Sequence, residues 1–172
     1  MSDLSSAALP GLDAHDHVRG PSDAVVLIEY GDLECAYCAA LHVRVEELRA
    51  LTPLRVAYRH FPVRSAHPRA WAAACAAEAA GFQGPFWEFH DAILADQGHI
   101  EDPHLWSLAE RFGLDLDQFE ADRRGSEAEI RVRADFTGGV RAGVVTTPTI
   151  FMDGVAYTGE RLRALLASLQ SR

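Results

Sequence analysis

A buried strand, a Cys-x-x-Cys motif and an amphipathic helix follow one another directly in residues 24–48. The segment "AVVLIEYG" (24–31) is almost continuously apolar and β-branched, which is typical of a strand buried on both faces of a parallel or mixed sheet. Apolar residues then recur at helical spacing, at Leu41, Val45 and Leu48. A second apolar run, "PLRVAYRHF" (53–61), predicts another strand. A strand, a helix and a strand in this order form a βαβ unit, whose two strands lie parallel.

The two cysteines of the motif, Cys35 and Cys38, are expected at the start of this helix. Free backbone N–H groups and the positive end of the helix dipole stabilise an anion there, and a thiol attacks only as the thiolate. Cys38 lies one turn after Cys35 on the same side, near enough to form a disulfide. The pattern therefore predicts a redox couple, in which one thiol attacks and the other resolves the mixed disulfide.

The sequence gives less support to other uses of the cysteines. A structural zinc site needs two further ligands, but there is no second Cys-x-x-Cys motif and Cys75 stands alone. Among the eight histidines, His15 and His17 are close together and the rest are scattered. No metal site is therefore predicted. Three alternatives stay open: a soft metal ion held by the motif itself, a redox-sensing interaction protein, and two inert cysteines.

The rest of the sequence predicts how the chain is divided. Helical patterns fill the middle, "TPTIFMDGVAYT" predicts a hairpin with an Asp-Gly turn, and "GERLRALLASL" predicts a final amphipathic helix. The order is β-α-β, a helical block, then β-β-α, which predicts an α/β fold with an inserted all-helical subdomain. The expected parts are a tail, the first part of the sheet domain, the insertion and the second part of the sheet domain, at 1–22, 23–61, 62–143 and 144–172.

Composition limits the function classes. A length of 172 residues suits one domain with an insertion, and the residues are 48% hydrophobic and 24% charged. The net charge is −9 with no basic run, so neither nucleic acid nor a membrane surface is an expected partner. The first residues lack the pattern of a secretory signal, and no segment approaches the roughly 20 apolar residues of a membrane span. Three cysteines are too few for a disulfide scaffold. We therefore expect a cytoplasmic location.

Several segments together resemble the thioredoxin superfamily, specifically its DsbA-like branch with a helical insertion. These segments are "SDAVVLIEYGDLECAYC", "YRHFPV", "AAEAAGFQGPFWEFHDAIL" and "VVTTPTIFMDG", and the resemblance extends over roughly residues 14–172. It implies a thioredoxin fold and a thiol–disulfide oxidoreductase with Cys35 as nucleophile and Cys38 as resolving thiol. It also implies that the Thr147–Pro148 bond is cis, beside the cysteines, and that this loop pairs with a substrate peptide as a strand would.

The resemblance also implies substrates and partners. Thr147, Pro148 and Tyr37 are expected at the bound substrate, which would be a protein or peptide thiol or disulfide. Glutathione or a thioredoxin-type protein would supply electrons, and no cofactor is needed. Because a reducing cytosol keeps such a couple mostly as the dithiol, reductase or isomerase activity is expected rather than net oxidation.

Two positions depart from the family pattern. Ala36 stands where the family often has Pro, and Tyr37 stands where its strongly oxidising members usually have His. Tyr37 offers no positive charge to a Cys35 thiolate. Asp32 and Glu34, which are close in sequence, are negative. We therefore expect the pKa of Cys35 to be lowered only moderately, toward the upper part of the roughly 3.5–7.5 range of activated cysteines.

Two further titratable residues stand out. Glu29 lies six residues before Cys35 within the otherwise apolar strand, where burial would raise its pKa. The family often has an acidic residue here, beneath the cysteines, so the resemblance makes Glu29 a candidate general base for Cys38; the alternative is a solvent-facing side chain. Cys75, in "WAAACAAEAA", is expected to be a buried structural thiol, and the alternative is a third redox thiol.

Overall fold

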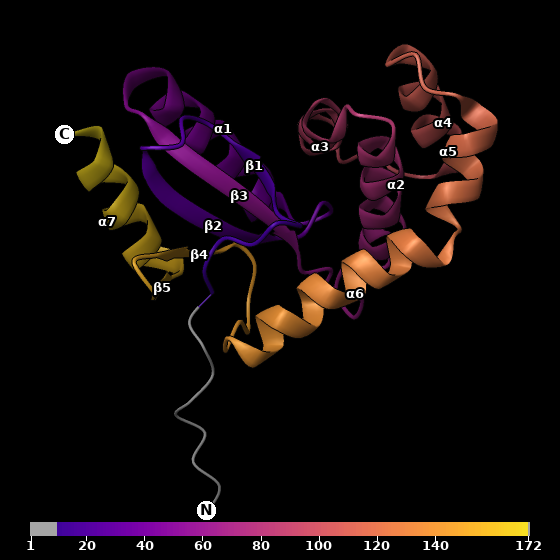
Figure 1. Ribbon diagram of the computed structural model, residues 1–172. Helices are drawn as coiled ribbons and strands as arrows, with labels where there is room; N and C mark the ends of the chain where they lie inside the picture. The colour runs from indigo at the N-terminus through magenta and orange to yellow at the C-terminus, as the bar shows by residue number, and fades with distance from the viewer. Residues whose placement is uncertain (1–9, 172) are drawn as a thin grey trace, which may run out of the picture.

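The computed structural model describes residues 10–171, which form a mixed five-stranded sheet packed against helices (Figure 1). The strands are β1 (His17–Arg19), β2 (Val25–Gly31), β3 (Leu54–His60), β4 (Thr149–Met152) and β5 (Val155–Tyr157). Their order across the sheet is β1-β3-β2-β4-β5. β2 and β3 pair in parallel, and the other neighbouring pairs are antiparallel.

The helices divide into those that cover the sheet and those of the insertion. They are α1 (Ala36–Leu51), α2 (Ala70–Phe82), α3 (Phe86–Ala95), α4 (Asp102–Arg111), α5 (Leu116–Arg123), α6 (Ser126–Arg141) and α7 (Gly159–Gln170). α1 joins the two parallel strands, whereas α2 to α6 lie between β3 and β4 in the chain. In Figure 1 the sheet, α1 and α7 occupy one half of the molecule, and α6 extends from the other half toward the sheet. From β2 onward, the predicted order of strands and helices is confirmed.

Alternating side chains of the central strands fill two apolar layers. Toward α1 and α7, Leu27, Val56 and Ile150 pack with leucines of both helices. Toward α6, Phe151 belongs to a second layer that includes Phe136 of that helix. Each fully buried side chain of this kind contributes roughly 1.5–3 kcal/mol to stability. Burial on both faces explains why the sequence of β2 is nearly continuously apolar.

The N-terminal boundary differs from the prediction. The sequence predicts a tail over residues 1–22, but His17–Arg19 form β1, an edge strand antiparallel to β3. Three residues are too few to show an alternating pattern, so periodicity does not reveal this strand. Gly20 follows with a φ of 106°, and a Cβ atom there would lie 2.0 Å from the Leu54 carbonyl oxygen. Residues 1–9 of the predicted tail lie outside the described residues.

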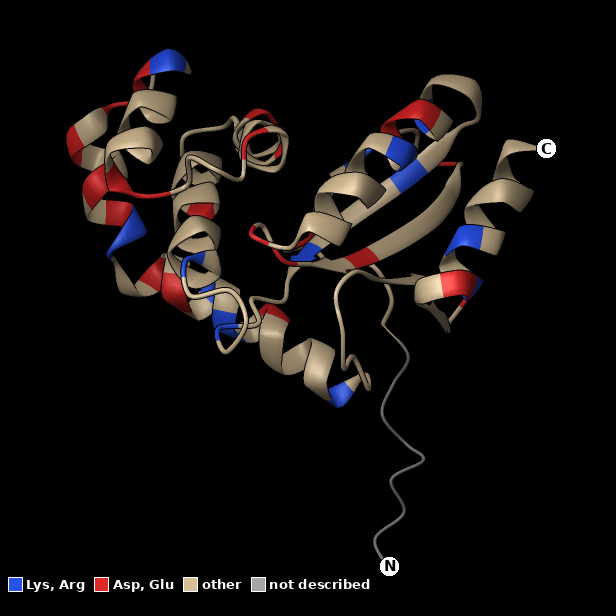
Figure 2. Cartoon of the chain, turned by 180° about the vertical axis from the view of Figure 1, so that it is seen from behind, with Lys and Arg blue, Asp and Glu red and all other residues tan. Residues whose placement is uncertain are grey.

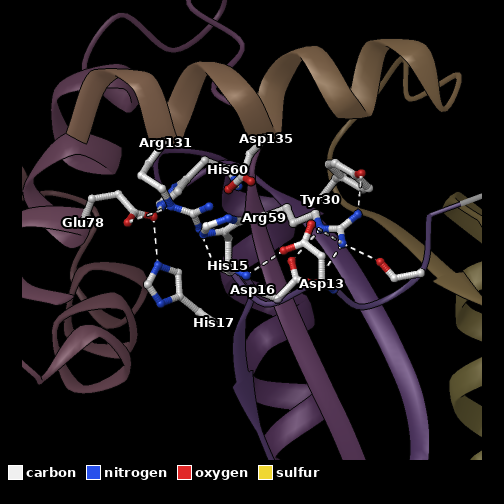
Figure 3. A network of polar contacts seen from close by, with 11 residues as sticks. Asp13, His15, Asp16, His17, Tyr30, Arg59, His60, Glu78, Arg131 and Asp135 are labelled. Carbon is white, nitrogen blue, oxygen red and sulfur yellow. Dashed lines mark hydrogen bonds and ion pairs between the residues drawn. The ribbon is translucent and has the colours of Figure 1, made fainter. Parts of the chain in front are cut away.

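A buried ionic cluster holds the helical insertion against the sheet (Figure 3). An oxygen of Glu78, on α2, lies 2.9 Å from His17 Nε2 of β1 and 3.0 Å from His60 Nε2 of β3. Arg131 of α6 lies 3.8 Å from the other Glu78 oxygen, and Asp135 of α6 accepts a hydrogen bond from the His60 backbone N–H. Burial would raise the pKa of Glu78, but hydrogen bonds from the two histidines outweigh it and hold this pKa well below its usual range. The insertion is therefore fixed relative to the strands that carry the site.

Candidate active site

The two cysteines of the motif lie at the junction between β2 and α1. Cys35 is the N-cap of α1 with an extended backbone (φ −79°, ψ 120°), and Cys38 lies in the first turn. The Cys38 backbone N–H donates to the Cys35 carbonyl oxygen at 3.0 Å. Both thiols are free and buried, with 4% of Cys35 and none of Cys38 exposed. The motif therefore lies at a helix start, where unpaired N–H groups favour an anion.

The environment separates the pKa values of the two thiols. A hydrogen bond from the Cys38 thiol makes the largest contribution to lowering the pKa of Cys35 to about 5, against the opposing effect of burial. Hydrogen bonds from the Thr147 side chain and from the backbone N–H groups of Cys38 and Tyr37 lower the pKa of Cys35 further. The same hydrogen bond with Cys35, then burial and the charge of Glu29, raise the pKa of Cys38 well above its usual value. At neutral pH Cys35 is therefore the thiolate and Cys38 keeps its proton.

The pKa of Cys35 is lower than the sequence predicts because hydrogen bonds formed only in the folded chain, first of all from Cys38, stabilise its thiolate. The acidic neighbours, in addition, are paired with other groups. Glu34 accepts hydrogen bonds from the Arg69 backbone N–H at 2.7 Å and from Arg69 Nε at 2.8 Å. An Asp32 carboxylate oxygen lies 2.9 Å from His67 Nδ1. Both partners come from the segment between β3 and α2. Their positive or hydrogen-bonding groups offset the two negative charges, which therefore oppose the Cys35 thiolate less than their sequence positions suggest.

A proline loop from the far end of the chain faces Cys35. The Thr147–Pro148 peptide bond is cis and leads directly into β4. The Cys35 Sγ atom lies 3.7 Å from the Thr147 carbonyl oxygen, to which the thiol can donate. β4 pairs antiparallel with β2, which brings this loop to the end of β2 where the motif begins. The predicted cysteines and the predicted proline loop therefore form one site.

Glu29 is buried on β2 beneath the cysteines. Only 5% of its surface is exposed, and its Oε1 atom has no hydrogen-bond partner among the described residues. Burial raises the pKa of Glu29 to about 8, although Arg19 partly opposes this. The charge of Glu29 also raises the pKa of Cys38, so the two groups are electrostatically coupled. The predicted burial is confirmed, whereas the role as general base stays a prediction.

A mostly apolar groove of about 500 Å³ runs beside the proline loop. Tyr37, which has 77% of its surface exposed, lines it together with Thr147 and Pro148. The three residues expected at the substrate therefore share one groove. The opposite wall, on α7, consists of Leu162, Arg163 and Leu166. Sequence reasoning missed this wall, because leucines at helical spacing indicate a core-facing stripe and give no sign of a groove.

The helical insertion also reaches the motif. Gln97, in the turn after α3, donates from its Nε2 atom to the carbonyl oxygens of Leu33 and Cys35, each at 2.9 Å. These two bonds hold the loop on which Cys35 begins the helix. A single glutamine in a turn carries no sequence signal, so only the folded chain reveals this contact.

Cys75 lies away from the motif, on the insertion helix α2. It is 4% exposed and packs with Ala128 and Val132 of α6. Burial raises the pKa of this thiol to about 11. The predicted buried position is confirmed, and at neutral pH such a thiol is a poor nucleophile.

One group of side chains among residues 10–171 has the spacing of metal ligands. His42 of α1 and His90 and Asp91 of α3 have candidate ligand atoms within 4.8 Å of one another. Asp91 already binds a cationic group, because Arg19 Nη1 lies 2.7 Å from its Oδ2 atom. A metal ion would meet the repulsion of this guanidinium. We therefore describe the group as an ion-paired junction between the sheet and the insertion.

Comparisons with known sequences identify the family. The sequence model of the family described as Thioredoxin matches residues 13–169. Among curated relatives, the Na(+)/H(+) antiporter NhaA 1 of Salinispora arenicola is 46% identical over 162 residues, covering 91% of this chain and 24% of that protein. The Na(+)/H(+) antiporter NhaA of Herminiimonas arsenicoxydans is 40% identical over 162 residues, covering 92% and 26%. The chain thus spans about a quarter of the length of the curated relatives it matches.

Solved structures show the same fold. The thiol-disulfide exchange protein α-DsbA2 from Wolbachia pipientis has a TM-score of 0.78 at 20% identity, covering 91% of this chain and 88% of that one. A thioredoxin-like oxidoreductase from Silicibacter pomeroyi also has a TM-score of 0.78, at 24% identity, covering 93% and 95%. BdbD from Bacillus subtilis has a TM-score of 0.74 at 16% identity, covering 92% and 94%.

The helical insertion between β3 and β4, together with the dithiol at the start of α1, defines a thioredoxin fold with inserted helices, which is the fold that these structures share. The chain belongs to the thioredoxin family, since the family match covers most of its length. The predicted thioredoxin fold with an inserted helical subdomain is confirmed. Within residues 10–171, no helix combines the length and the apolar character needed to cross a bilayer.

Proposed function

We propose that this chain reduces or isomerises disulfides of proteins or peptides, starting from its dithiol form. The observation that carries this proposal is the difference between the two thiols: the pKa of Cys35 is lowered to about 5, and that of Cys38 is raised. At neutral pH a stable thiolate is therefore available for attack beside a thiol that keeps its proton.

The proposed reaction has two steps. The Cys35 thiolate attacks one sulfur of a substrate disulfide, forms a mixed disulfide and releases the other substrate sulfur as a thiolate. Glu29, once it has lost its own proton, then accepts the proton of Cys38, which attacks the Cys35 sulfur. This forms the Cys35–Cys38 disulfide and releases the second substrate sulfur. In isomerisation, a thiol of the substrate itself attacks the mixed disulfide, and Cys35 leaves as the thiolate.

The stability of the Cys35 thiolate favours isomerisation over strong net reduction. A stabilised thiolate makes the dithiol form more stable and so raises the reduction potential of the couple. In a reducing compartment the chain would then persist as the dithiol, with its attacking group ready and little tendency to give up electrons. We propose the cytoplasm as this compartment, with glutathione or a thioredoxin-type protein restoring any disulfide that forms.

The groove beside the proline loop suggests the kind of substrate. A peptide in extended form would lie along the backbone of residues 146–148 in strand-like pairing, which places its disulfide near Cys35. Apolar side chains of the peptide would face Leu162 and Leu166. Arg44 and Arg163 also line the groove, but each already pairs with a glutamate of its own helix, so they add little preference for an acidic peptide. Figure 2 shows basic and acidic segments close together on these helices.

The test is the reduction potential of the Cys35–Cys38 couple against glutathione, combined with two activity assays. One assay measures reduction of a protein disulfide with excess thiol, and the other measures recovery of a protein with scrambled disulfides. We expect recovery of the scrambled protein, lost in Cys35→Ser. If the couple instead oxidises a reduced substrate and is found as a disulfide in cells, the proposal is wrong in direction and compartment.

The same preparation tests the alternatives that the sequence left open. Protein purified under reducing conditions is analysed for bound metal, and its turnover is measured with a small disulfide. Stoichiometric soft metal with little turnover would support a metal-binding protein. A partner that binds one redox state, again with little turnover, would support a redox-sensing interaction protein.

A further inference from the structure

Three buried polar atoms behind the cysteines have no hydrogen-bond partner among the described residues. They are Glu29 Oε1 on β2, the Tyr58 hydroxyl on β3 and His90 Nε2 on α3. Each residue is at most 5% exposed. Buried polar groups are bonded in the great majority of cases, and ordered internal water is the usual partner where the protein supplies none. Three such atoms in one region therefore indicate an internal water site.

Glu29 and Tyr58 reach the same point from neighbouring strands. They are register partners in the parallel pair β2–β3, so their side chains leave the sheet on one face. A Cβ atom at Gly31 would lie 3.0 Å from Glu29 Oε1, 3.0 Å from Tyr58 Cζ and 2.4 Å from Tyr58 Cε2. Both side chains therefore pass close above Gly31. Any larger residue at Gly31 would displace them.

His90 connects this interior region to the edge of the protein. Its ring packs edge-on against Tyr58, with ring centroids 4.3 Å apart. Its Nδ1 atom lies 2.8 Å from Asp91 Oδ1, and the Asp91 side chain is 35% exposed. Burial lowers the pKa of His90 to about 4. The imidazole is therefore neutral, and when Nδ1 carries the proton toward Asp91, Nε2 offers a free lone pair.

We propose that Tyr58 and His90, bridged by internal water, relay protons between Glu29 and the half-exposed carboxylate of Asp91. This inference rests on the proposed role of Glu29 as the base for Cys38. Glu29 and Cys38 are both buried, so a proton moved between them cannot reach solvent directly. Tyr58 and His90 act through Glu29 and are positioning residues for the second step of the reaction.

Each transfer in the relay conserves protons. Below its pKa of about 8 the Glu29 carboxyl carries a proton, which it first gives to the bridging water or directly to Tyr58, whose own O–H proton passes to His90 Nε2. Cys38 then gives its S–H proton to the resulting Glu29 carboxylate and attacks as the thiolate. The Nδ1 proton of His90 moves to the Asp91 carboxylate and from there to bulk water. One proton leaves the interior, and no group is oxidised or reduced by the relay.

The experiment separates the two steps in single turnover. Reduced protein is mixed with an excess of an aromatic disulfide that releases a coloured thiol. The first absorbance phase reports attack by Cys35, and the second reports displacement by Cys38. The variants are Tyr58→Phe, His90→Gln, the double variant and Glu29→Gln, each measured in H2O and in D2O. The matched control is Tyr30→Phe, a buried tyrosine whose hydroxyl accepts a hydrogen bond from Arg59 and which packs in the other apolar layer of the sheet.

We expect Tyr58→Phe and His90→Gln each to slow the second phase by about tenfold, below the roughly 10²-fold minimum of direct acid–base catalysis because slower water paths remain. The first phase should be unchanged. The double variant should be no slower than the slower single variant, since both lie on one path, and the slowed phase should show a larger solvent isotope effect than the wild type.

Three results would overturn the relay. The first is a wild-type second phase in both single variants while Glu29→Gln is slow; the relay then fails and the role of Glu29 stands. The second is an equal slowing of both phases, or an equal effect of Tyr30→Phe, which would show a general structural effect. The third is a wild-type second phase in Glu29→Gln itself, which would show that the proposed base is wrong and that the relay fails with it. If Tyr58→Phe does not fold, His90→Gln alone still tests the relay.

Discussion

The Cys35 sulfur and the Thr147 carbonyl oxygen are 3.7 Å apart, although 112 residues separate them in sequence. The contact joins the start of α1 to the loop that leads into β4. A substrate strand that paired with this loop would place its disulfide within reach of the Cys35 thiolate. The contact therefore couples the binding of a peptide to the position of the attacking sulfur.

Replacement of each cysteine should produce a different defect. Cys35→Ser should abolish exchange, because the group with the lowered pKa is lost. Cys38→Ser should accumulate mixed disulfides with substrates, because nothing in the chain then displaces Cys35. Mass spectrometry of trapped complexes and pH-dependent alkylation measure both. Alkylation of the reduced wild type at pH 6 should label Cys35 first, and preferential labelling of Cys38 would reverse the assigned roles.

Gln97→Ala should loosen the loop that carries Cys35. The Leu33 carbonyl loses its side-chain donor, whereas the Cys35 carbonyl keeps its bond from the Cys38 N–H; the loss costs about 1–3 kcal/mol of unfolding free energy. The Cys35 thiolate should also lose part of the N–H geometry that stabilises it, so alkylation of Cys35 at pH 5 to 6 should slow several-fold. Urea unfolding and alkylation rates measure the two effects.

Gln83→Ala is the matched control for Gln97→Ala. Gln83 is also half-buried and exchanges two hydrogen bonds with the backbone of Asp115, away from the cysteines. Gln83→Ala should lower the unfolding free energy by an amount similar to that of Gln97→Ala and leave the alkylation rate of Cys35 unchanged. An equal change of this rate in both variants would show that Gln97 has no specific role at the motif.

The sequence predicts what depends on local pattern. The periodicity of residues 24–61 predicts the βαβ unit, and the Asp-Gly pair predicts the hairpin, where Asp153 and Gly154 take φ values of 49° and 76°. It does not predict which charges meet. The pairing of Glu34 with Arg69 depends on tertiary structure, because the two residues are 35 positions apart. The hydrogen bond from Cys38, which lowers the pKa of Cys35 most, also forms only in the folded chain.

Cys75→Ala should retain most of the exchange activity. This thiol is buried between α2 and α6, and its pKa is raised to about 11, so little thiolate exists at neutral pH. Turnover with a small disulfide should match the wild type, and Cys75 should react with an alkylating agent only after unfolding. Loss of turnover in folded Cys75→Ala, shown by an unchanged circular dichroism spectrum, would identify Cys75 as a third redox thiol.

Glu29→Gln should change how stability depends on pH. The folded protein keeps the Glu29 proton up to a pKa of about 8, whereas the unfolded chain loses it near 4.5, the ordinary pKa of a glutamate. Between these values unfolding releases a proton, so the wild type loses stability as pH rises and levels off above pH 8. Glutamine has no such proton. The unfolding free energy of Glu29→Gln should therefore rise relative to the wild type by up to about 4 kcal/mol from pH 5 to pH 8, at about 1.4 kcal/mol per pKa unit.

Denaturant unfolding at several pH values measures this difference, with Glu160→Gln as control. Glu160 lies at the start of α7 with 92% of its side chain exposed. The unfolding free energies of Glu160→Gln and the wild type should therefore differ by nearly the same amount at every pH. If the unfolding free energies of Glu29→Gln and the wild type also differed by the same amount at every pH, water would reach the Glu29 carboxylate in the folded state. The pKa of Glu29 would then not be raised by burial, and its proposed role in the second step of the reaction would be wrong.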